Sequence, residues 1–215
     1  MSKKHIGPML VSFVGQKGGV GKSALARLVA VGGAHRGLKV LLADFDLDQL
    51  TSLSWNAKRL QAGIQPDIDA RSFKSLKKLR AAADGFDLIV ADTRGLADDF
   101  TTEIAEESDL IFLPTSSSFD DLDPTIALGR ALRKKGTRKK VILILSKIGK
   151  SERQHGIAAA AVEEAGHDLL SAVWPQRDGF QTDLDAGRAG RETRNAFLKE
   201  AAMAVEEAIF KRIGF

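Results

Sequence analysis

The sequence predicts an α/β protein with a single domain, in which helices flank a doubly wound, mainly parallel β-sheet. Three observations support this class. Short apolar runs rich in β-branched residues alternate along the chain with stretches of helical pattern, as strands and crossover helices do in parallel sheets. A glycine-rich loop separates the first apolar run from the first helical stretch. No repeat, low-complexity tract or linker divides the 215 residues, 44% of which are hydrophobic.

Six runs that are apolar at nearly every position are predicted to be strands covered on both faces. In chain order they are MLVSFV (9–14), VLLADF (40–45), FDLIVAD (86–92), DLIFLPT (109–115), VILILS (141–146) and LLSAVWP (169–175). The segments between them are long enough for the crossover helices that parallel strands require.

Two helices carry clear sequence signals. LARLVAVGGAHRG (25–37) has basic residues in its last turn and ends at Gly37, a typical stop. RETRNAFLKEAAMAVEEAIFKRI (191–213) places Phe197, Ala201, Val205 and Ile209 at intervals of four, which predicts a closing amphipathic helix.

Composition narrows the function classes. The chain has no cysteine, which excludes a disulfide framework and a thiolate metal site, and no run approaches the length of a membrane-spanning helix. We therefore expect a cytoplasmic protein. The 32 basic and 28 acidic side chains give a net charge of only +4, which alone does not predict nucleic-acid binding. Basic residues gather in RKKGTRKK (133–140) and near the C-terminus, where ordinary solvated surface is the alternative explanation.

The loop GQKGGVGKS (15–23) carries the most specific chemistry. It fits the phosphate-loop variant K-G-G-x-G-K-[ST], with Gln16 where the stricter pattern has glycine. Glycines let backbone amides close around phosphate oxygens without side chains in the way. Lys22 is expected against the β and γ phosphates, and the Ser23 hydroxyl is expected to ligate Mg²⁺. The predicted nucleotide-binding residues of the loop are Gly18, Gly19, Val20, Gly21, Lys22, Ser23 and Ala24.

Lys17 is a second lysine in a loop that ordinarily needs one to hold a nucleotide. Here the residues resemble a family: KGGVGKS is similar to the deviant Walker A loop of the ParA/MinD ATPases. In that family the first lysine reaches across a dimer interface to the partner's ATP. The resemblance covers nearly the whole chain, 1–215, and implies one P-loop ATPase domain of the small ParA type, with no separate N-terminal DNA-binding domain.

The resemblance extends to the strand ends. VLLADFDLDQL resembles the family's second motif, which assigns Asp44 to metal support and Asp46 to positioning the attacking water; carboxylates at strand ends suit both tasks. FDLIVADTRG resembles the Walker B strand and its switch, which places Asp92 beside Mg²⁺ and the segment 93–95 near the γ phosphate. Arg94 stands where most members carry proline, alanine or glycine.

Two further segments concern the base. Ser146 and Lys147 occupy the place of an asparagine that often contacts adenine in the family. WPQRDGFQTDLDAGRAGRE (174–192) resembles a late loop and helix of small ParA proteins, which implies that Pro175 and Arg177 lie near the adenine or the dimer interface.

The resemblance implies a DNA-partition switch. The chain would bind ATP with Mg²⁺, form a homodimer, bind nonspecific DNA on the nucleoid, and hydrolyse ATP slowly until a centromere-binding or other adaptor protein stimulates it. Lys17, Lys22 and Asp46 would carry catalysis, and no arginine finger is evident from the sequence. The DNA-contacting residues are predicted to be Arg188, Arg191, Arg194 and Lys199, which cluster after the dimer-side loop.

Two other interpretations stay open. A MinD-like membrane switch is suggested by the C-terminus, EEAIFKRIGF (206–215), whose apolar and basic residues are also those of a short interfacial helix. Such a helix packed against the core is the simpler explanation of the same pattern. A metabolic P-loop enzyme with the same fold is the third interpretation, since a fold does not define an activity.

Overall fold

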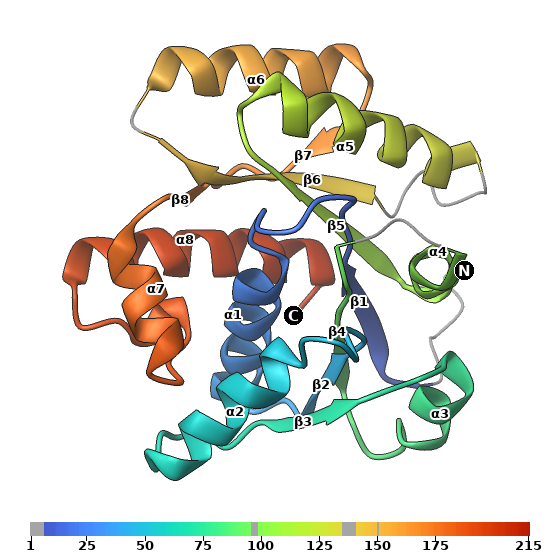
Figure 1. Ribbon diagram of the computed structural model, residues 1–215, viewed down its shortest axis with the longest axis vertical. Helices are drawn as coiled ribbons and strands as arrows, with labels where there is room; N and C mark the ends of the chain where they lie inside the picture. The colour runs from blue at the N-terminus through green and yellow to red at the C-terminus, as the bar shows by residue number, and fades with distance from the viewer. Residues whose placement is uncertain (1–6, 96–98, 135–140, 150) are drawn as a thin grey trace.

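The computed structural model describes residues 7–95, 99–134, 141–149 and 151–215. Its core is a parallel sheet with the strand order β3-β2-β4-β1-β5-β6-β7, and β8 pairs with β6 (Figure 1). The strands are β1 (Met9–Phe13), β2 (Val40–Asp44), β3 (Asp69–Ser72), β4 (Leu88–Asp92), β5 (Leu110–Thr115), β6 (Val141–Ile148), β7 (Asp168–Leu169) and β8 (Trp174–Pro175). The helices are α1 (Lys22–His35), α2 (Thr51–Gln61), α3 (Leu76–Ala81), α4 (Asp99–Glu107), α5 (Phe119–Leu132), α6 (Glu152–Glu164), α7 (Asp178–Asp185), the 3-10 helix η2 (Gly190–Glu192) and α8 (Ala196–Ile213). The predicted α/β class with a parallel sheet is confirmed.

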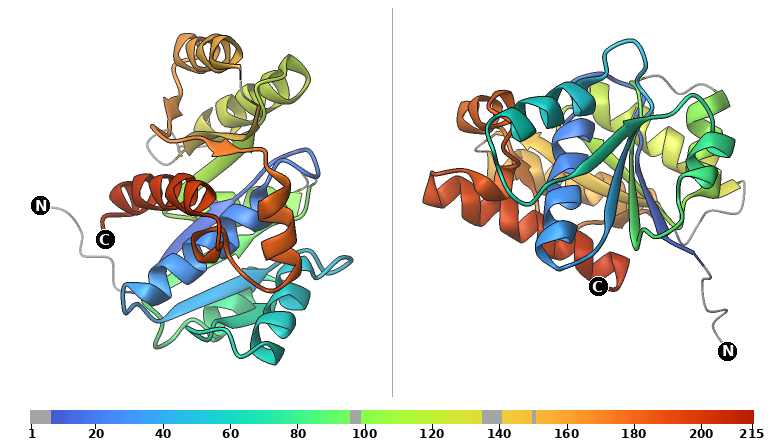
Figure 2. Two further views of the ribbon diagram at one scale, coloured as in Figure 1. Left: turned by 90° about the vertical axis from the view of Figure 1, so that its left-hand side faces the viewer. Right: turned by 90° about the horizontal axis from the view of Figure 1, so that it is seen from below.

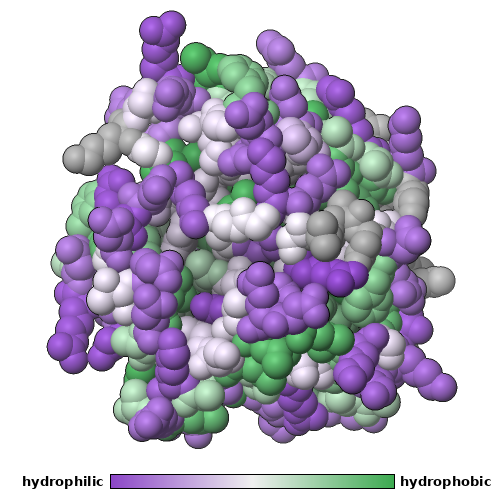
Figure 3. Space-filling model, in the orientation of Figure 1, coloured by the Kyte–Doolittle hydropathy of each residue, from purple (hydrophilic) through white to green (hydrophobic). Residues whose placement is uncertain are grey.

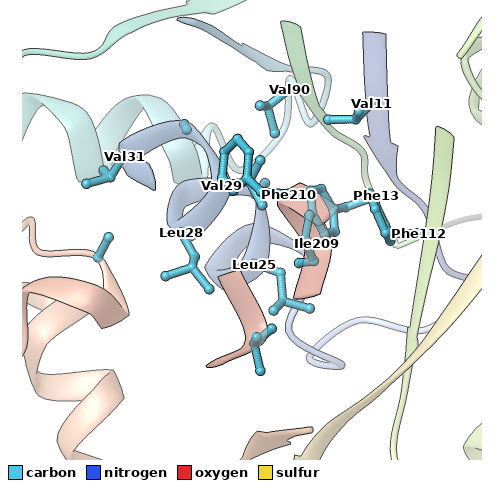
Figure 4. Close-up of a cluster of buried hydrophobic side chains, with 14 of the residues drawn as sticks. Val11, Phe13, Leu25, Leu28, Val29, Val31, Val90, Phe112, Ile209 and Phe210 are labelled. Carbon is cyan, nitrogen blue, oxygen red and sulfur yellow. The ribbon is translucent and has the colours of Figure 1, made fainter. Parts of the chain in front are cut away.

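Helices cover both faces of the sheet (Figure 2). On one face α1 and α8 form a core with the strands (Figure 4). Two aromatic side chains join this core, Trp55 from α2 and Phe180 from α7. On the other face α5 and α6 pack in one cluster and α3 and α4 in a second. β6 alternates between the faces, with Ile142 and Ile144 on the α1 side and Leu143 and Leu145 on the other. This double burial explains why the strands in the middle of the sheet are apolar at nearly every position.

The register brings the carboxyl ends of three neighbouring strands together. Asp92, the last residue of β4, is opposite Phe13 on one side and Asp44 on the other. The glycine-rich loop leaves the sheet directly after β1, so it starts beside both carboxylates. In open parallel sheets this edge is where ligands bind.

Two sequence predictions need correction. LLSAVWP is not one strand, because the chain leaves the sheet after β7 and returns as β8, which meets β6 only across a register shift between Ser146 and Ile148. This detour lets the ring of Trp174 stack on Phe180, with centroids 4.3 Å apart. β3 (DARS) was not predicted, since an edge strand with exposed polar residues lacks an apolar signal.

The closing helix exists as predicted, but its buried face differs at the N-terminal end. Phe197 is 63% exposed, whereas Leu198 and Ala202 are buried beside Val205 and Ile209. The helix starts only at Ala196, capped by Asn195, whose Oδ1 accepts the amide of Leu198.

The outer surface is mainly hydrophilic on the face shown in Figure 3, with smaller hydrophobic areas between hydrophilic side chains. In the part of the chain that the structure describes, no helix combines the length and the apolar character needed to cross a bilayer.

Candidate nucleotide-binding site

The glycine-rich loop connects β1 to α1 through backbone conformations that glycine favours. Gly19 and Gly21 have positive φ angles of 79° and 99°, which side chains rarely tolerate. A Cβ atom on Gly21 would also lie 2.5 Å from the hydroxyl of Ser146. Sequence and geometry therefore agree that this loop presents bare backbone to its surroundings.

Lys22 is the buried lysine of the loop. Its Nζ donates to the carbonyl oxygen of Lys17 at 2.9 Å, and the residue is only 6% exposed. Burial lowers the pKa of the ammonium, and the carboxylates of Asp92 and Asp46 act in the opposite direction. Because Lys22 lines both cavities that open beside the loop, it can contact phosphates in either.

Ser23 and Asp92 bring together a hydroxyl and a carboxylate that could hold a metal ion. The Ser23 hydroxyl donates to one oxygen of Asp92 at 3.1 Å, and the Ser52 hydroxyl donates to the other at 2.7 Å. The hydroxyl of Thr51 lies 3.4 Å from that of Ser23. Mg²⁺ prefers one or two carboxylates together with substrate phosphates and water, so a hydroxyl beside a buried carboxylate fits it.

The carboxyl groups of Asp92 and Asp44 are buried, which disfavours their ionised form. Asp92 is 1% exposed, and burial raises its pKa to about 6, while hydrogen bonds from the two serines and the nearby guanidinium of Arg27 oppose the shift. Burial also raises the pKa of Asp44. A divalent cation would favour the ionised form of both carboxyls.

Asp44 and Asp46 have different surroundings. Both oxygens of Asp44 accept backbone amides, from Asp46 on one side and from Ser52 and Leu53 at the start of α2 on the other. Asp44 thus holds the loop that carries Asp46. Asp46 accepts the amide of Gln49 at 3.1 Å, and it lines the cavity beside Lys22 and Ser23.

The larger cavity, about 400 Å³, is lined by residues at the start of α1 and by residues of the β8–α7 segment. Pro175 and Arg177 line it, as does Lys147 from the end of β6. Lys147 has a φ of 55°, a left-handed backbone uncommon for a residue with a side chain, at the register shift between β6 and β8. Size and position suit the base and sugar of a nucleotide.

The smaller cavity, about 280 Å³, lies on the side of the loop that faces Asp46. Its lining residues are Gly18, Gly19, Lys22, Ser23, Asp46, Asp48, Gln49, Thr51, Thr93, Arg94 and Gly95. Five of the predicted phosphate, metal and water residues meet here, namely Gly18, Gly19, Lys22, Ser23 and Asp46. Gly21 and Ala24 line the larger cavity instead, and the buried residues Val20, Asp44 and Asp92 are in neither lining.

The side chain of Lys17 extends away from both cavities and contacts α5. Its Nζ donates to the backbone carbonyl of Asp120 at 2.6 Å and to the carboxylate of Asp121 at 2.8 Å, in the first turn of α5. This contact lowers the pKa of Asp121, helped by a hydrogen bond from Ser116. Lys17 is absent from the described linings of both cavities, and its side chain is 46% exposed.

The four residues predicted to contact DNA do not share one environment. Arg191 donates to the buried carboxylate of Glu206 at 2.5 Å, and Arg188 lies 3.8 Å from Asp183. Arg194 and Lys199 are exposed. The structure thus separates this group into two engaged and two exposed cations.

Sequence reasoning missed Arg27, Thr51 and Ser52. Arg27 is buried, lines the larger cavity, and its Nε donates to the Ser52 hydroxyl at 3.1 Å. Hydroxyls shortly after the D-x-D motif were the available signal for Thr51 and Ser52. Arg27 gave none, because its approach to Ser52 depends on how α1 packs beside α2.

A glycine-rich loop between a central parallel strand and a helix, with a buried lysine and a serine facing two cavities, defines a P-loop nucleotide-binding protein. Residues 11–188 match the family model described as the CobQ/CobB/MinD/ParA nucleotide binding domain. The chain belongs to this family.

Relatives and solved structures agree with this assignment. The protein virC1 of Rhizobium radiobacter is 30% identical over 128 residues, a region spanning 56% of this chain and 54% of that protein. The protein ParA of the same organism is 22% identical over 218 aligned positions, covering 95% of this chain and 97% of ParA. A putative plasmid partition protein from Borrelia burgdorferi, solved with AMPPNP, has a TM-score of 0.72 at 17% identity, covering 95% of this chain and 99% of its own. MinD from Pyrococcus horikoshii, solved with Mg-ADP, has a TM-score of 0.73 at 18% identity, and the match covers 96% of this chain and 98% of the MinD chain.

Proposed function

We propose that this protein is an ATP-dependent, dimerising ATPase that works as a DNA-partition switch. In the ATP state two copies would join and bind DNA without sequence preference. Hydrolysis, stimulated by a centromere-binding or other adaptor protein, would separate them. The family membership, and the partition-type names of ParA and of the Borrelia protein, support this direction.

The division of labour between the two lysines carries the proposal. Lys22 is buried against its own loop, whereas Lys17 extends from the same loop to the first turn of α5. A cation at the rim can leave an exposed partner at little cost, because exposed ion pairs contribute little. Lys17 is therefore available to reach the ATP of a second copy once the two loops face each other.

In this proposal, slow hydrolysis would rest on the chain's own residues. Bound ATP would be oriented by the loop amides and Lys22, and Mg²⁺ by Ser23 and Asp92. Asp46, which lines the smaller cavity, would orient water toward the γ phosphate. Pro175 and Arg177 would border the base. Catalysis of this kind rests on positioning and charge neutralisation.

The membrane-switch interpretation has less support. Three of the four apolar residues that suggested an interfacial helix, Ile209, Phe210 and Ile213, are at most 5% exposed, and only Phe215 is open to solvent, at 53%. Their apolar surface is already used in the α1–α8 core. No specific observation among the described residues supports the third interpretation, a metabolic P-loop enzyme.

Sedimentation velocity tests the proposal directly. Wild type, Lys17→Ala and the surface control Lys77→Ala would be compared with ADP or a slowly hydrolysed ATP analogue, with and without nonspecific duplex DNA. We expect wild type and Lys77→Ala to dimerise and bind DNA with the analogue only, and Lys17→Ala to do neither. A wild type that stays monomeric and ignores DNA in every nucleotide state would end the proposal and redirect the search to small-molecule substrates.

A further inference from the structure

Arg94 is one of the residues that line the smaller cavity, where the terminal phosphate of a nucleotide would sit. The residues lining this cavity include Lys22 and Ser23 on the loop side and Asp46 on the opposite side. Among the described lining residues, Lys22 and Arg94 are the two cations, because Lys17 extends to α5. The sequence motif marked Arg94 only as a departure from its family.

The backbone on both sides of Arg94 is anchored. Before it, Thr93 is 3% exposed, and its hydroxyl donates to the carbonyl of Phe13 at 2.9 Å, which ties the segment to the end of β1. After it, Gly95 lies so close to the phosphate loop that a Cβ there would come within 2.9 Å of the Gly18 amide nitrogen. Arg94 therefore sits at the point where the end of β4 meets the loop.

In the smaller cavity, the charge of Lys22 alone would not balance the negative charges around a bound nucleotide. Asp46 and Asp48 line it, and a nucleoside triphosphate would add several negative charges. A guanidinium stays protonated in proteins and donates through a planar fork that suits phosphoryl oxygens.

We propose that Arg94 is a catalytic residue, an arginine supplied in cis that stabilises the transferring γ-phosphoryl group. This inference rests on the proposed ATP hydrolysis and names the residue that would neutralise its charge. The oxygen of water would bond to the γ phosphorus as the bond to the bridging oxygen breaks. ADP would leave with that oxygen and its electron pair, and both protons of the water would leave on the phosphate as H2PO4⁻. The guanidinium would contact the equatorial oxygens, where charge accumulates.

A purely structural role makes a different prediction. If Arg94 only holds the segment against the loop, its removal should weaken ADP and ATP-analogue binding together. If it acts on the transition state, ADP binding should persist while the transition-state mimic no longer binds tightly, because only interactions specific to the transition state accelerate chemistry.

The test compares wild type, Arg94→Ala, Arg94→Lys and the surface control Arg80→Ala, whose arginine pairs with Glu107 on the outside. Calorimetry would give the affinities for Mg-ADP alone and for Mg-ADP with aluminium fluoride, and phosphate release would give kcat and KM. We expect Arg94→Ala to bind Mg-ADP within about threefold of wild type, yet to lose the gain in affinity from aluminium fluoride and at least about 100-fold in kcat.

Arg94→Lys should recover part of both losses, and Arg80→Ala should match wild type. The proposal is overturned if Arg94→Ala keeps the aluminium fluoride gain and the wild-type kcat, or if ADP affinity falls as much as affinity for the mimic. These outcomes are separate from failure of the dimer switch. The calorimetric comparison needs no turnover, and sedimentation of Lys17→Ala decides the dimer.

Discussion

Burial of the Asp92 carboxylate lowers the free energy of unfolding when neither metal nor nucleotide is bound. Its folded-state pKa of about 6 lies above the ordinary value of 3.8, so the folded state binds more protons than the unfolded state between these pH values. Stability must then fall as pH rises through this window, by an amount on the order of 2–3 kcal/mol. The cost is the reverse of the usual case, in which a paired carboxylate stabilises the fold above its pKa.

The consequence is testable by Asp92→Asn in the absence of metal and nucleotide. Because the amide carries no charge to bury, we expect the variant to be more stable than wild type at pH 8, with the difference shrinking as the pH falls to 5. Urea unfolding at several pH values measures this, and Asp84→Asn on the surface is the control. A stability difference that stays constant with pH would show that charge burial is not the cause.

At this scale, a local motif was enough to predict which side chains lie together. Lys22, Ser23 and Asp46 lie around the smaller cavity because the loop and the strand ends carry them there. The direction of Lys17 could not be predicted, since its partners in α5 are more than one hundred residues away in the chain. The contact of Arg27 with Ser52 was hidden for the same reason.

Among the elements, those with a strong apolar signal were the predictable ones. Strands buried on both faces, such as β2 and β4, appear within a residue or two of their predicted limits. β3 has no such signal because it is short and exposed at the edge. In α8 the predicted periodicity was right and the buried face was wrong at Phe197, where packing on the sheet chose Leu198.

The link between α2 and η2 depends on one buried ion pair. Arg59 is fully buried, and its two terminal nitrogens donate to Glu192 at 2.6 and 2.7 Å; the guanidinium also donates to the carbonyls of Pro66 and Gly187. We expect Glu192→Ala to cost about 3–5 kcal/mol, because it leaves a guanidinium buried without its counter-ion.

Urea unfolding of Glu192→Ala, of Arg59→Met and of the double variant would measure this coupling. The double variant should be less destabilised than the sum of the two single changes, since it removes both charges. Nucleotide affinity should also fall in Glu192→Ala, because α7 lines the larger cavity and packs beside η2. Strict additivity would show that the pair contributes no coupling.

For the whole molecule, the proposed partition function requires a surface that meets DNA. The structure divides the four predicted cations into Arg194 and Lys199, which are exposed, and Arg188 and Arg191, which lie near Asp183 and Glu206. A solvated cation exchanges only water for a DNA phosphate, whereas a cation paired with a carboxylate must first break its ion pair. The exposed pair is therefore the better candidate, if the proposed ATP dimer presents this surface to a duplex.

We expect Arg194→Ala combined with Lys199→Ala to weaken DNA binding by the ATP-analogue dimer equally for unrelated sequences. The slope of log affinity against log salt should fall by about one for each DNA phosphate that the variant no longer neutralises. Arg188→Ala combined with Arg191→Ala should instead lower stability, because it leaves the buried Glu206 with one fewer partner, and should change the salt slope less. Affinities of both double variants at several salt concentrations, with sedimentation to establish that each still dimerises, decide between the pairs. If the change at Arg188 and Arg191 lowers the salt slope more, their ion pairs with Asp183 and Glu206 must open when DNA binds, and the DNA-binding surface would then include η2. If neither double variant lowers the salt slope, the DNA-binding surface lies away from the η2–α8 region.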